Sequence, residues 1–171
     1  MILEATLDRI YFGRVWSLAS RAKGVRQLIG EELDLHNLLI ALSLKARGVS
    51  VRDMEESLIP LSYRLPQSQL RSLLQSRLED ASGILTGGYS KLTAEASDML
   101  KSDSSSPLEW LFFRQLYNDA TIALRTRALD PEYIMAYLLL CECEAKNLVS
   151  IVTGKQLNLP GEEISKGLFG I

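Results

Sequence analysis

A pattern that occurs twice in the chain constrains its fold more than any other feature. Both copies read acid-x-acid-x-x-Asn-Leu, followed by an apolar helix face, a lysine and a short acidic segment. The matched residues lie 110 positions apart (147 minus 37) and are Glu32, Asp34, Asn37 and Lys45 in the first copy and Glu142, Glu144, Asn147 and Lys155 in the second. The stretches before them, LDRIYFGRVW and LEWLFFRQLY, match at an offset of 101 (108 minus 7). Self-similarity at a fixed offset is typical of a repeated structural unit, so we expect one helical unit twice, in residues 1–105 and 106–171.

The apolar residues predict the class of that unit. They recur at the spacing of a helix face, and no useful length of the chain alternates with the period of two that a strand requires. Leu7, Tyr11, Val15, Leu18 and Ala22 make the first such stripe. Further helices are expected over about 31–47, 51–58, 67–78, 90–101, 107–129 and 131–154, with a short one after residue 160. The fold class is therefore predicted to be all-α.

Local signals place the ends of several of these helices. The predicted helix stops are Gly24, Gly48 and Gly154. Ser50 and Asp53 have the spacing of a capping box that opens a short helix, and Pro66 stands at the start of the next one. The segment SDSSSP, residues 102–107, is the clearest predicted loop, and its last two residues double as a helix start signal. These signals divide the chain into the helices given above.

The two asparagines are unusual, because asparagine is a poor helix former and both stand inside predicted helices. For each, an acid three residues earlier on the same face could accept from the amide, and the other amide atoms could reach a neighbouring helix. Our interpretation is a polar link that holds a helix pair at a fixed angle. The alternative is a polar patch presented to a partner.

Composition and charge bear on the partners. Apolar residues make up 47% and charged residues 23% of the chain, as in ordinary globular proteins. The net charge of −2 is spread evenly, so no segment is basic enough to neutralise a run of phosphates, and no nucleic-acid partner is expected. The apolar stretch 133–141 is about half as long as a bilayer span, and acid and base come too early in MILEATLDRIYF for a signal peptide. We therefore expect a soluble chain with at most a peripheral membrane role.

The Gly154–Lys155 pair raises the question of a phosphate-binding loop. The frame Gly-x-x-x-x-Gly-Lys-Ser/Thr is absent there, and no predicted strand precedes it. The stretch GILTGGYS, residues 83–90, has two of the glycines of that frame, but Tyr89 stands where the lysine is needed. No nucleotide binding and no cofactor are expected.

No constellation of side chains predicts catalysis either. His36, the single histidine, is interpreted as packed or solvated rather than as a base. Glu31 and Glu32, like the other adjacent acid pairs, point apart on a helix and are interpreted as solvated caps. Cys141 and Cys143 point about 200° apart, so neither a shared metal nor a disulfide is expected, and both are interpreted as small hydrophobes. The chain is therefore not expected to be an enzyme.

Taken in order along the chain, the motifs resemble a known family, the C subunit of prokaryotic V-type (A-type) ATP synthases, which is related to the d subunit of the eukaryotic vacuolar proton pump. The matching stretches are Glu4-x-x-Leu7-Asp8-Arg9-x-Tyr11-Phe12, Asp34-x-x-Asn37-Leu38 with Lys45-x-x-Gly48, Glu142-x-Glu144-x-x-Asn147-Leu148-x-x-Ile151, and Gly154-Lys155 through Leu159-Pro160-x-Glu162-Glu163-Ile164. They cover nearly the whole chain. Members of that family are longer, and the resemblance places this sequence at the second and third of three helical units.

The resemblance implies a funnel-like, non-catalytic helical protein on the cytoplasmic side of the membrane. Such a protein sits on the membrane rotor ring, receives the central shaft and couples the two for proton or sodium transport. It implies no active site and no cofactor. The rival interpretation is a helical-repeat adaptor that binds a partner helix or peptide, since such a protein would also show repeats without catalytic residues.

Overall fold

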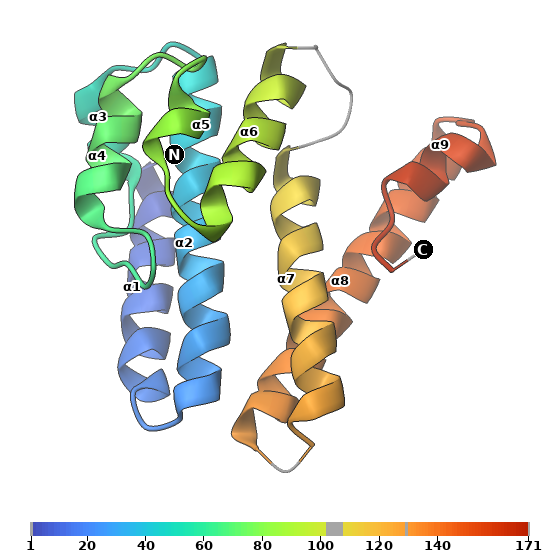
Figure 1. Cartoon of the computed structure of the whole chain (residues 1–171). Coiled ribbons are helices and arrows are strands. Elements are labelled where there is room, and N and C mark those ends of the chain that lie inside the picture. Colours follow the sequence, from blue (N-terminus) through green and yellow to red (C-terminus); the bar gives the residue numbers. More distant parts are fainter. Residues whose placement is uncertain (1, 102–107, 129, 171) are drawn as a thin grey trace. The chain divides into compact units, whose positions relative to one another are not determined.

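The computed structural model describes residues 2–101, 108–128 and 130–170 of the chain. Within these ranges every regular element is a helix (Figure 1). The helices are α1 (Ile2–Ala19), α2 (Lys23–Ala46), α3 (Val51–Ser57), α4 (Gln67–Gln75), α5 (Ala81–Ile84), α6 (Gly88–Lys101), α7 (Leu108–Thr126), α8 (Pro131–Gln156) and α9 (Gly161–Lys166). The prediction of an all-α fold is confirmed.

The chain divides into two compact units, residues 1–112 and residues 113–171, which are described separately below. The predicted boundary between residues 105 and 106 falls within 102–107, outside the described residues. The predicted SDSSSP loop and the start signal at its end lie outside them as well.

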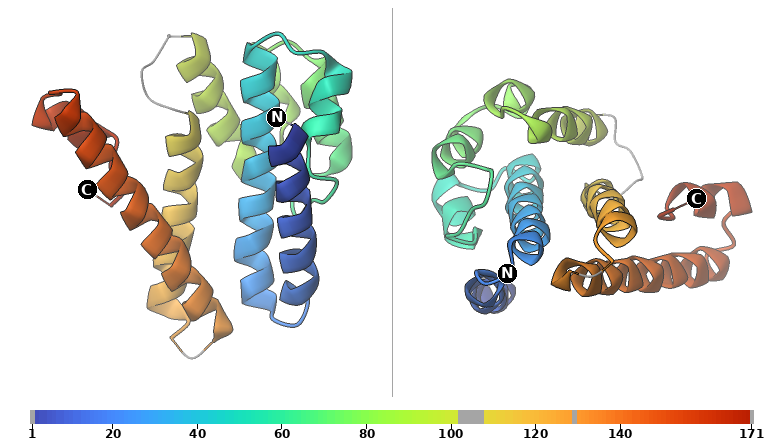
Figure 2. Two further views of the ribbon diagram at one scale, coloured as in Figure 1. Left: turned by 180° about the vertical axis from the view of Figure 1, so that it is seen from behind. Right: turned by 60° about the horizontal axis from the view of Figure 1, so that its bottom comes forward.

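Helix α2 is the centre of the first unit. It contacts α1 along one side and α3, α4 and α6 on others (Figure 2). A helix enclosed in this way must be apolar over most of its circumference, and twelve of its residues are buried. They are Leu28, Ile29, Gly30, Glu31, Leu33, Asp34, Leu35, Asn37, Leu38, Ala41, Leu42 and Leu44. The helix that carries the first copy of the motif is thus the core helix of its unit.

The predicted division between the first two helices is wrong. Helix α1 ends at Ala19, and α2 begins at Lys23, so Gly24 lies in the first turn of α2 rather than after α1. Glycine is tolerated in a first turn, where part of the backbone is not yet held by helical hydrogen bonds. The helix that was expected to begin near Glu31 therefore has about two more turns at its start.

The predicted apolar stripe of α1 is also wrong. Leu7, Tyr11 and Leu18 are exposed, whereas Phe12 and Ala19 are buried. Phe12 packs with Leu33 of α2 and Ile59 from the segment after α3, with Trp16 and Leu61 at the edge of the cluster. The contact of α1 with α2 is therefore made by a different face from the one that sequence spacing suggested.

The short helices of the first unit follow the local signals. Ser50 Oγ accepts a hydrogen bond from the Asp53 backbone N–H at 3.2 Å, which confirms the predicted cap at Ser50, and it donates to the Asp53 carboxylate at 2.7 Å, so this carboxylate binds the hydroxyl of the cap. Pro66 precedes α4, whose buried residues Leu70, Leu73 and Leu74 belong to the predicted face.

The second unit contains most of α7, together with α8 and α9. Helix α9 folds back on the C-terminal part of α8 (Figure 1). Gly154 was predicted to end α8, but the helix continues to Gln156. A Cβ atom at Gly154 would lie 2.6 Å from Cγ1 of Ile164 on α9. The glycine therefore permits a close approach of two helices, and the stop falls later, at Asn158 with its φ of 55°.

Candidate functional site

Asn37 fastens α2 to the segment that follows α3. Its Nδ2 donates to the carbonyl oxygens of Ile59 at 3.1 Å and Leu61 at 3.2 Å, and its Oδ1 accepts from the Ile59 N–H at 2.9 Å. We call the pair of hydrogen bonds between one asparagine amide and one residue's backbone the amide bridge. Asn37 is 1% exposed, and both its amide nitrogen and its amide oxygen are hydrogen-bonded.

Asn147 makes the same amide bridge in the second unit. Its Nδ2 donates to the carbonyl of Phe169 at 3.0 Å, and its Oδ1 accepts from the Phe169 N–H at 2.8 Å. The bridged residue again lies 22 positions after the asparagine. The expected acceptor was an acid three residues before each asparagine, and this was wrong, because both amides bind backbone instead.

The ends of the two long helices also match at the same offset. After α2 the N–H of Val49 donates to Leu44 O at 3.1 Å, and after α8 the N–H of Leu159 donates to Gly154 O at 2.9 Å. The residue before each donor has a left-handed backbone, Gly48 with a φ of 69° and Asn158 with a φ of 55°. Hydrogen bonds of this kind satisfy the last carbonyls of a helix and turn the chain back along it.

A phenylalanine ring lies next to a histidine or lysine side chain in each unit. The Phe12 and His36 ring centroids are 5.4 Å apart. In the second unit Lys146 Nζ lies 4.1 Å from the centroid of Phe113. Phe113 is also 6.3 Å from the ring of Phe169, the residue held by the amide bridge. In the first unit Phe12 packs against Ile59, the residue held by the amide bridge, so in both units the bridged segment packs against the preceding long helix, α1 or α7.

Asp34 holds a turn of the first unit through its carboxylate. It accepts from the backbone N–H groups of Tyr63 at 2.9 Å, Arg64 at 2.7 Å and Leu65 at 2.9 Å, and from the Tyr89 hydroxyl at 3.0 Å. Burial raises the pKa of Asp34 above its usual value, although the three backbone donors oppose the shift. Burial, followed by the nearby Asp34 carboxylate, raises the pKa of the Tyr89 hydroxyl as well.

Glu31 stands one turn before Asp34 and is not the solvated cap that was predicted. It is 7% exposed and accepts from Arg64 Nη1 at 2.8 Å and from Gln27 Nε2 at 3.2 Å. The interpretation was wrong because α2 begins at Lys23, which places Glu31 inside the helix. Sequence reasoning also missed Arg64 and Tyr89, since neither belongs to the repeated pattern and both lie far from Asp34 along the chain.

The ammonium group of Lys45 caps the C-terminus of α4. Its Nζ donates to the carbonyls of Leu73 at 3.0 Å and Leu74 at 2.9 Å and also to that of Ser76. Cations are favourable at a helix C-terminus, where carbonyls lack helical partners. Burial lowers the pKa of Lys45, and the charge of Glu79 acts in the opposite direction. Lys45 and Asp34 thus fix the two ends of the same segment, residues 63–76, against α2.

The remaining predicted site residues lie at other places on α2 and α8. Glu32 is half-buried on α2, about 200° around the helix from Asp34. In the second unit Glu142, Glu144 and Lys155 are exposed on or near the surface of α8. Asn147 is half-buried and is the one member of the second copy that repeats the contact of its counterpart.

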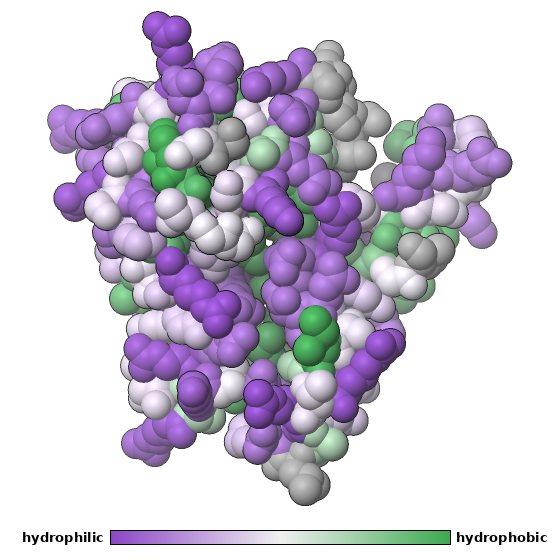
Figure 3. All heavy atoms as spheres, in the orientation of Figure 1, coloured by the Kyte–Doolittle hydropathy of each residue, from purple (hydrophilic) through white to green (hydrophobic). Residues whose placement is uncertain are grey.

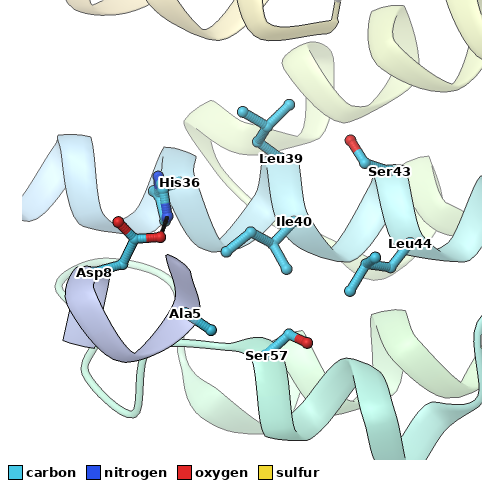
Figure 4. A pocket seen from close by; sticks show the side chains of 8 residues that line it. All are labelled: Ala5, Asp8, His36, Leu39, Ile40, Ser43, Leu44 and Ser57. Atoms are coloured by element: carbon cyan, nitrogen blue, oxygen red, sulfur yellow. Dashed lines mark hydrogen bonds and ion pairs between the residues drawn. The ribbon is translucent and has the colours of Figure 1, made fainter. Parts of the chain in front are cut away.

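A groove of about 370 Å³ in the first unit contains the single histidine. Figure 4 shows His36 and Asp8 pointing toward each other, and their Nε2 and Oδ2 atoms are 3.2 Å apart. Ser43 and Ser57 also line the groove but stand apart from this pair (Figure 4). The histidine is thus held between Asp8 and the ring of Phe12, and neither serine lies next to it.

The described ranges contain no group of three or more His, Cys, Asp or Glu side chains placed to hold a metal. Cys143 is buried, which raises the pKa of its thiol to about 11, and Cys141 is half-buried. None of the helices in these ranges combines the length and the apolar character needed to cross a membrane.

Comparison with known proteins gives a match over nearly the whole chain. A protein-family model described as ATP synthase (C/AC39) subunit matches residues 1–167. The C subunits of several archaeal A-type ATP synthases are similar to this chain: that of Methanothermobacter thermautotrophicus is 29% identical over 90% of this chain and 42% of its own length. The Methanocaldococcus jannaschii protein is 26% identical (85% and 37%), and the Archaeoglobus fulgidus protein is 25% identical (96% and 48%). The chain spans less than half the length of these relatives, and no solved structure gives a significant match.

Proposed function

The chain belongs to the ATP synthase (C/AC39) subunit family, as its motifs predicted, and from this premise we propose that it is a non-catalytic central-stalk subunit of a rotary V/A-type ATPase. In this role it couples the rotor shaft to the membrane ring that translocates ions. The match of the family over residues 1–167 is the observation that carries the proposal.

The hydrogen bonds within each unit support a mechanical role. A coupling element must transmit torque without bending, so its helices have to keep their angles under load. In each unit an amide bridge joins a long helix to the segment that follows a short helix. The bridge consists of two hydrogen bonds, whose geometry is narrowly defined. We further propose that the two units are copies of one ancestral unit and that Asn37 and Asn147 keep the same function in both.

The proposed partners are the membrane rotor ring and the central shaft. The chain would lie peripherally on the cytoplasmic side of the membrane and would serve proton or sodium transport. Neither a nucleotide nor a nucleic acid is part of this function, since the chain would transmit the motion that ATP hydrolysis drives elsewhere in the complex.

Affinity purification from mildly solubilised membranes tests the assignment. A tagged copy of the chain, expressed in its own organism, is expected to elute with the catalytic ATPase subunits and the ring protein in constant proportion over a salt wash. Elution without any rotary ATPase subunit would contradict the proposal. It would instead favour the helical adaptor, whose partner would be the protein that elutes in their place.

A further inference from the structure

Helix α8 is apolar on two opposite faces. One face, which includes Ala136, Leu139 and Cys143, is buried within the second unit. The other carries large exposed side chains, with exposed fractions between 55% and 66%. They are Ile134, Tyr137, Leu138, Leu148, Val149 and Val152. Figure 3 views the chain from the side on which α9 lies against α8, and there hydrophobic residues near these two helices lie between hydrophilic ones. A helix that is apolar on all sides is normally enclosed by neighbours, and an exposed apolar stripe marks a contact surface.

The corresponding face of α2 shows what covers such a stripe. At an offset of 110, Leu138 and Leu148 correspond to Leu28 and Leu38, and these are 1% and 0% exposed. Helix α2 contacts α4 and α6, which supply apolar side chains such as Leu70. The outward face of α8 therefore has the character of a surface that, in the first unit, is buried under other helices.

Two polar side chains on α8 show how the cover would be oriented. Glu144 and Lys155 stand where Asp34 and Lys45 stand on α2, and both are exposed. Asp34 accepts from the turn before α4, and Lys45 donates to the carbonyls that end α4. The covering helix in the first unit thus runs in the same direction as α2, with its start at the acid and its end at the lysine.

We propose that the outward face of α8 binds a leucine-faced helix of another protein of the rotary complex. That helix lies parallel to α8, offers backbone N–H groups at its first turn to Glu144, and places its C-terminal carbonyls against Lys155. A second copy of this chain fits less well, because its own α4 is already held by Asp34 and Lys45. The proposal rests on the proposed function, since the partner is another component of that complex.

Photocrosslinking on the assembled complex tests this inference. A photoreactive phenylalanine analogue is placed at Val149, on the outward face, and in a matched sample at Ser150, which is also exposed but points about 100° away around the helix. We expect Val149 to give a several-fold higher yield of a product with a different protein of the complex. The crosslinked peptide should be helical, with leucines three and four residues apart. The charge reversal Lys155→Glu should lower that yield.

Three outcomes would overturn the inference: a crosslink within the same chain, a crosslink to a second copy, or equal or absent products at both positions. A second experiment does not need the photoreactive phenylalanine analogue. Val149→Asp should leave the thermal unfolding of the isolated chain unchanged, because the side chain is 66% exposed, but should reduce assembly. If the chain still purifies with the rotary ATPase and assembly is unaffected by Val149→Asp, the inference fails while the proposed function stands.

Discussion

Replacing each bridging asparagine by leucine should destabilise the first unit far more than the second. Asn37 is 1% exposed and makes three hydrogen bonds to backbone, whereas Asn147 is half-buried and makes two. Leucine is similar in size but has no polar atoms. In the first unit it leaves the buried N–H and C=O of Ile59 without partners, whereas in the second unit the lost hydrogen bonds to Phe169 are only part-buried.

The expected magnitudes follow from the number of buried groups left unpaired. A buried donor or acceptor without a partner costs about 1–3 kcal/mol, and leucine regains a few tenths of a kcal/mol in helix propensity. For Asn37→Leu we expect a loss of about 2–4 kcal/mol, which corresponds to a decrease in Tm of about 5–15 °C in a chain of this size. For Asn147→Leu we expect about 0.5–1 kcal/mol, or less than about 4 °C.

Two optical signals separate the units in one melting experiment. Both tryptophans, Trp16 and Trp110, belong to the first unit, so their fluorescence reports on it, while circular dichroism follows the helices of both. Asn118→Leu serves as control, since Asn118 is exposed on α7 and the substitution should leave Tm within about 2 °C. Equal losses for Asn37→Leu and Asn147→Leu, or a larger loss for the second, would refute the reasoning from burial.

Three further predictions concern the same helices. Asp34→Ala removes the acceptor of three backbone N–H groups and should lower the free energy of unfolding by about 3 kcal/mol or more. Glu144→Ala, at the matching exposed position, should change it by less than about 0.5 kcal/mol, and similar urea midpoints for the two variants would contradict this. Because burial raises the pKa of Asp34 in the folded state, the parent should gain stability relative to Asp34→Asn as the pH falls through that raised pKa toward 3.8. Urea unfolding at a series of pH values measures this difference in stability, and a gain with rising pH would contradict the prediction. Gly154→Ala places a Cβ 2.6 Å from Ile164 and should cost about 1–2 kcal/mol, and Ile164→Ala in the same chain should restore part of it; an additive double mutant would show that the contact is not responsible.

Features that depend on neighbouring residues were predictable from the sequence. The capping box at Ser50, the left-handed turn at Gly48 and the leucine face of α4 are each set within one or two turns of chain. The offset of 110 residues in the sequence predicted that Asn37 and Asn147 are equivalent, but it did not predict the backbone groups that they bind. The boundary at Gly24 was wrong because a glycine in a first turn and a glycine after a last turn look alike in sequence.

Features that depend on distant segments were not predictable. The partner of each asparagine is a backbone group 22 residues later. Every residue has a backbone carbonyl, so the order of side chains does not indicate which carbonyl accepts. Exposed Leu7 and Leu18 on α1 show the same limit, since apolar spacing indicates a face but does not say which neighbour covers it. The roles of Arg64 and Tyr89 depend on the course of the chain between α3 and α6.

The central claim, that the chain couples shaft and ring, is tested most directly by the number of ions moved per ATP hydrolysed. Membrane vesicles that carry the rotary ATPase are prepared with and without the chain. ATP hydrolysis is measured on each sample, and ion uptake is measured on the same sample with proton- and sodium-sensitive dyes. We predict that without the chain hydrolysis continues while the ions moved per ATP fall sharply, and that adding the purified chain restores the ratio. An unchanged ratio in vesicles without the chain would contradict the account.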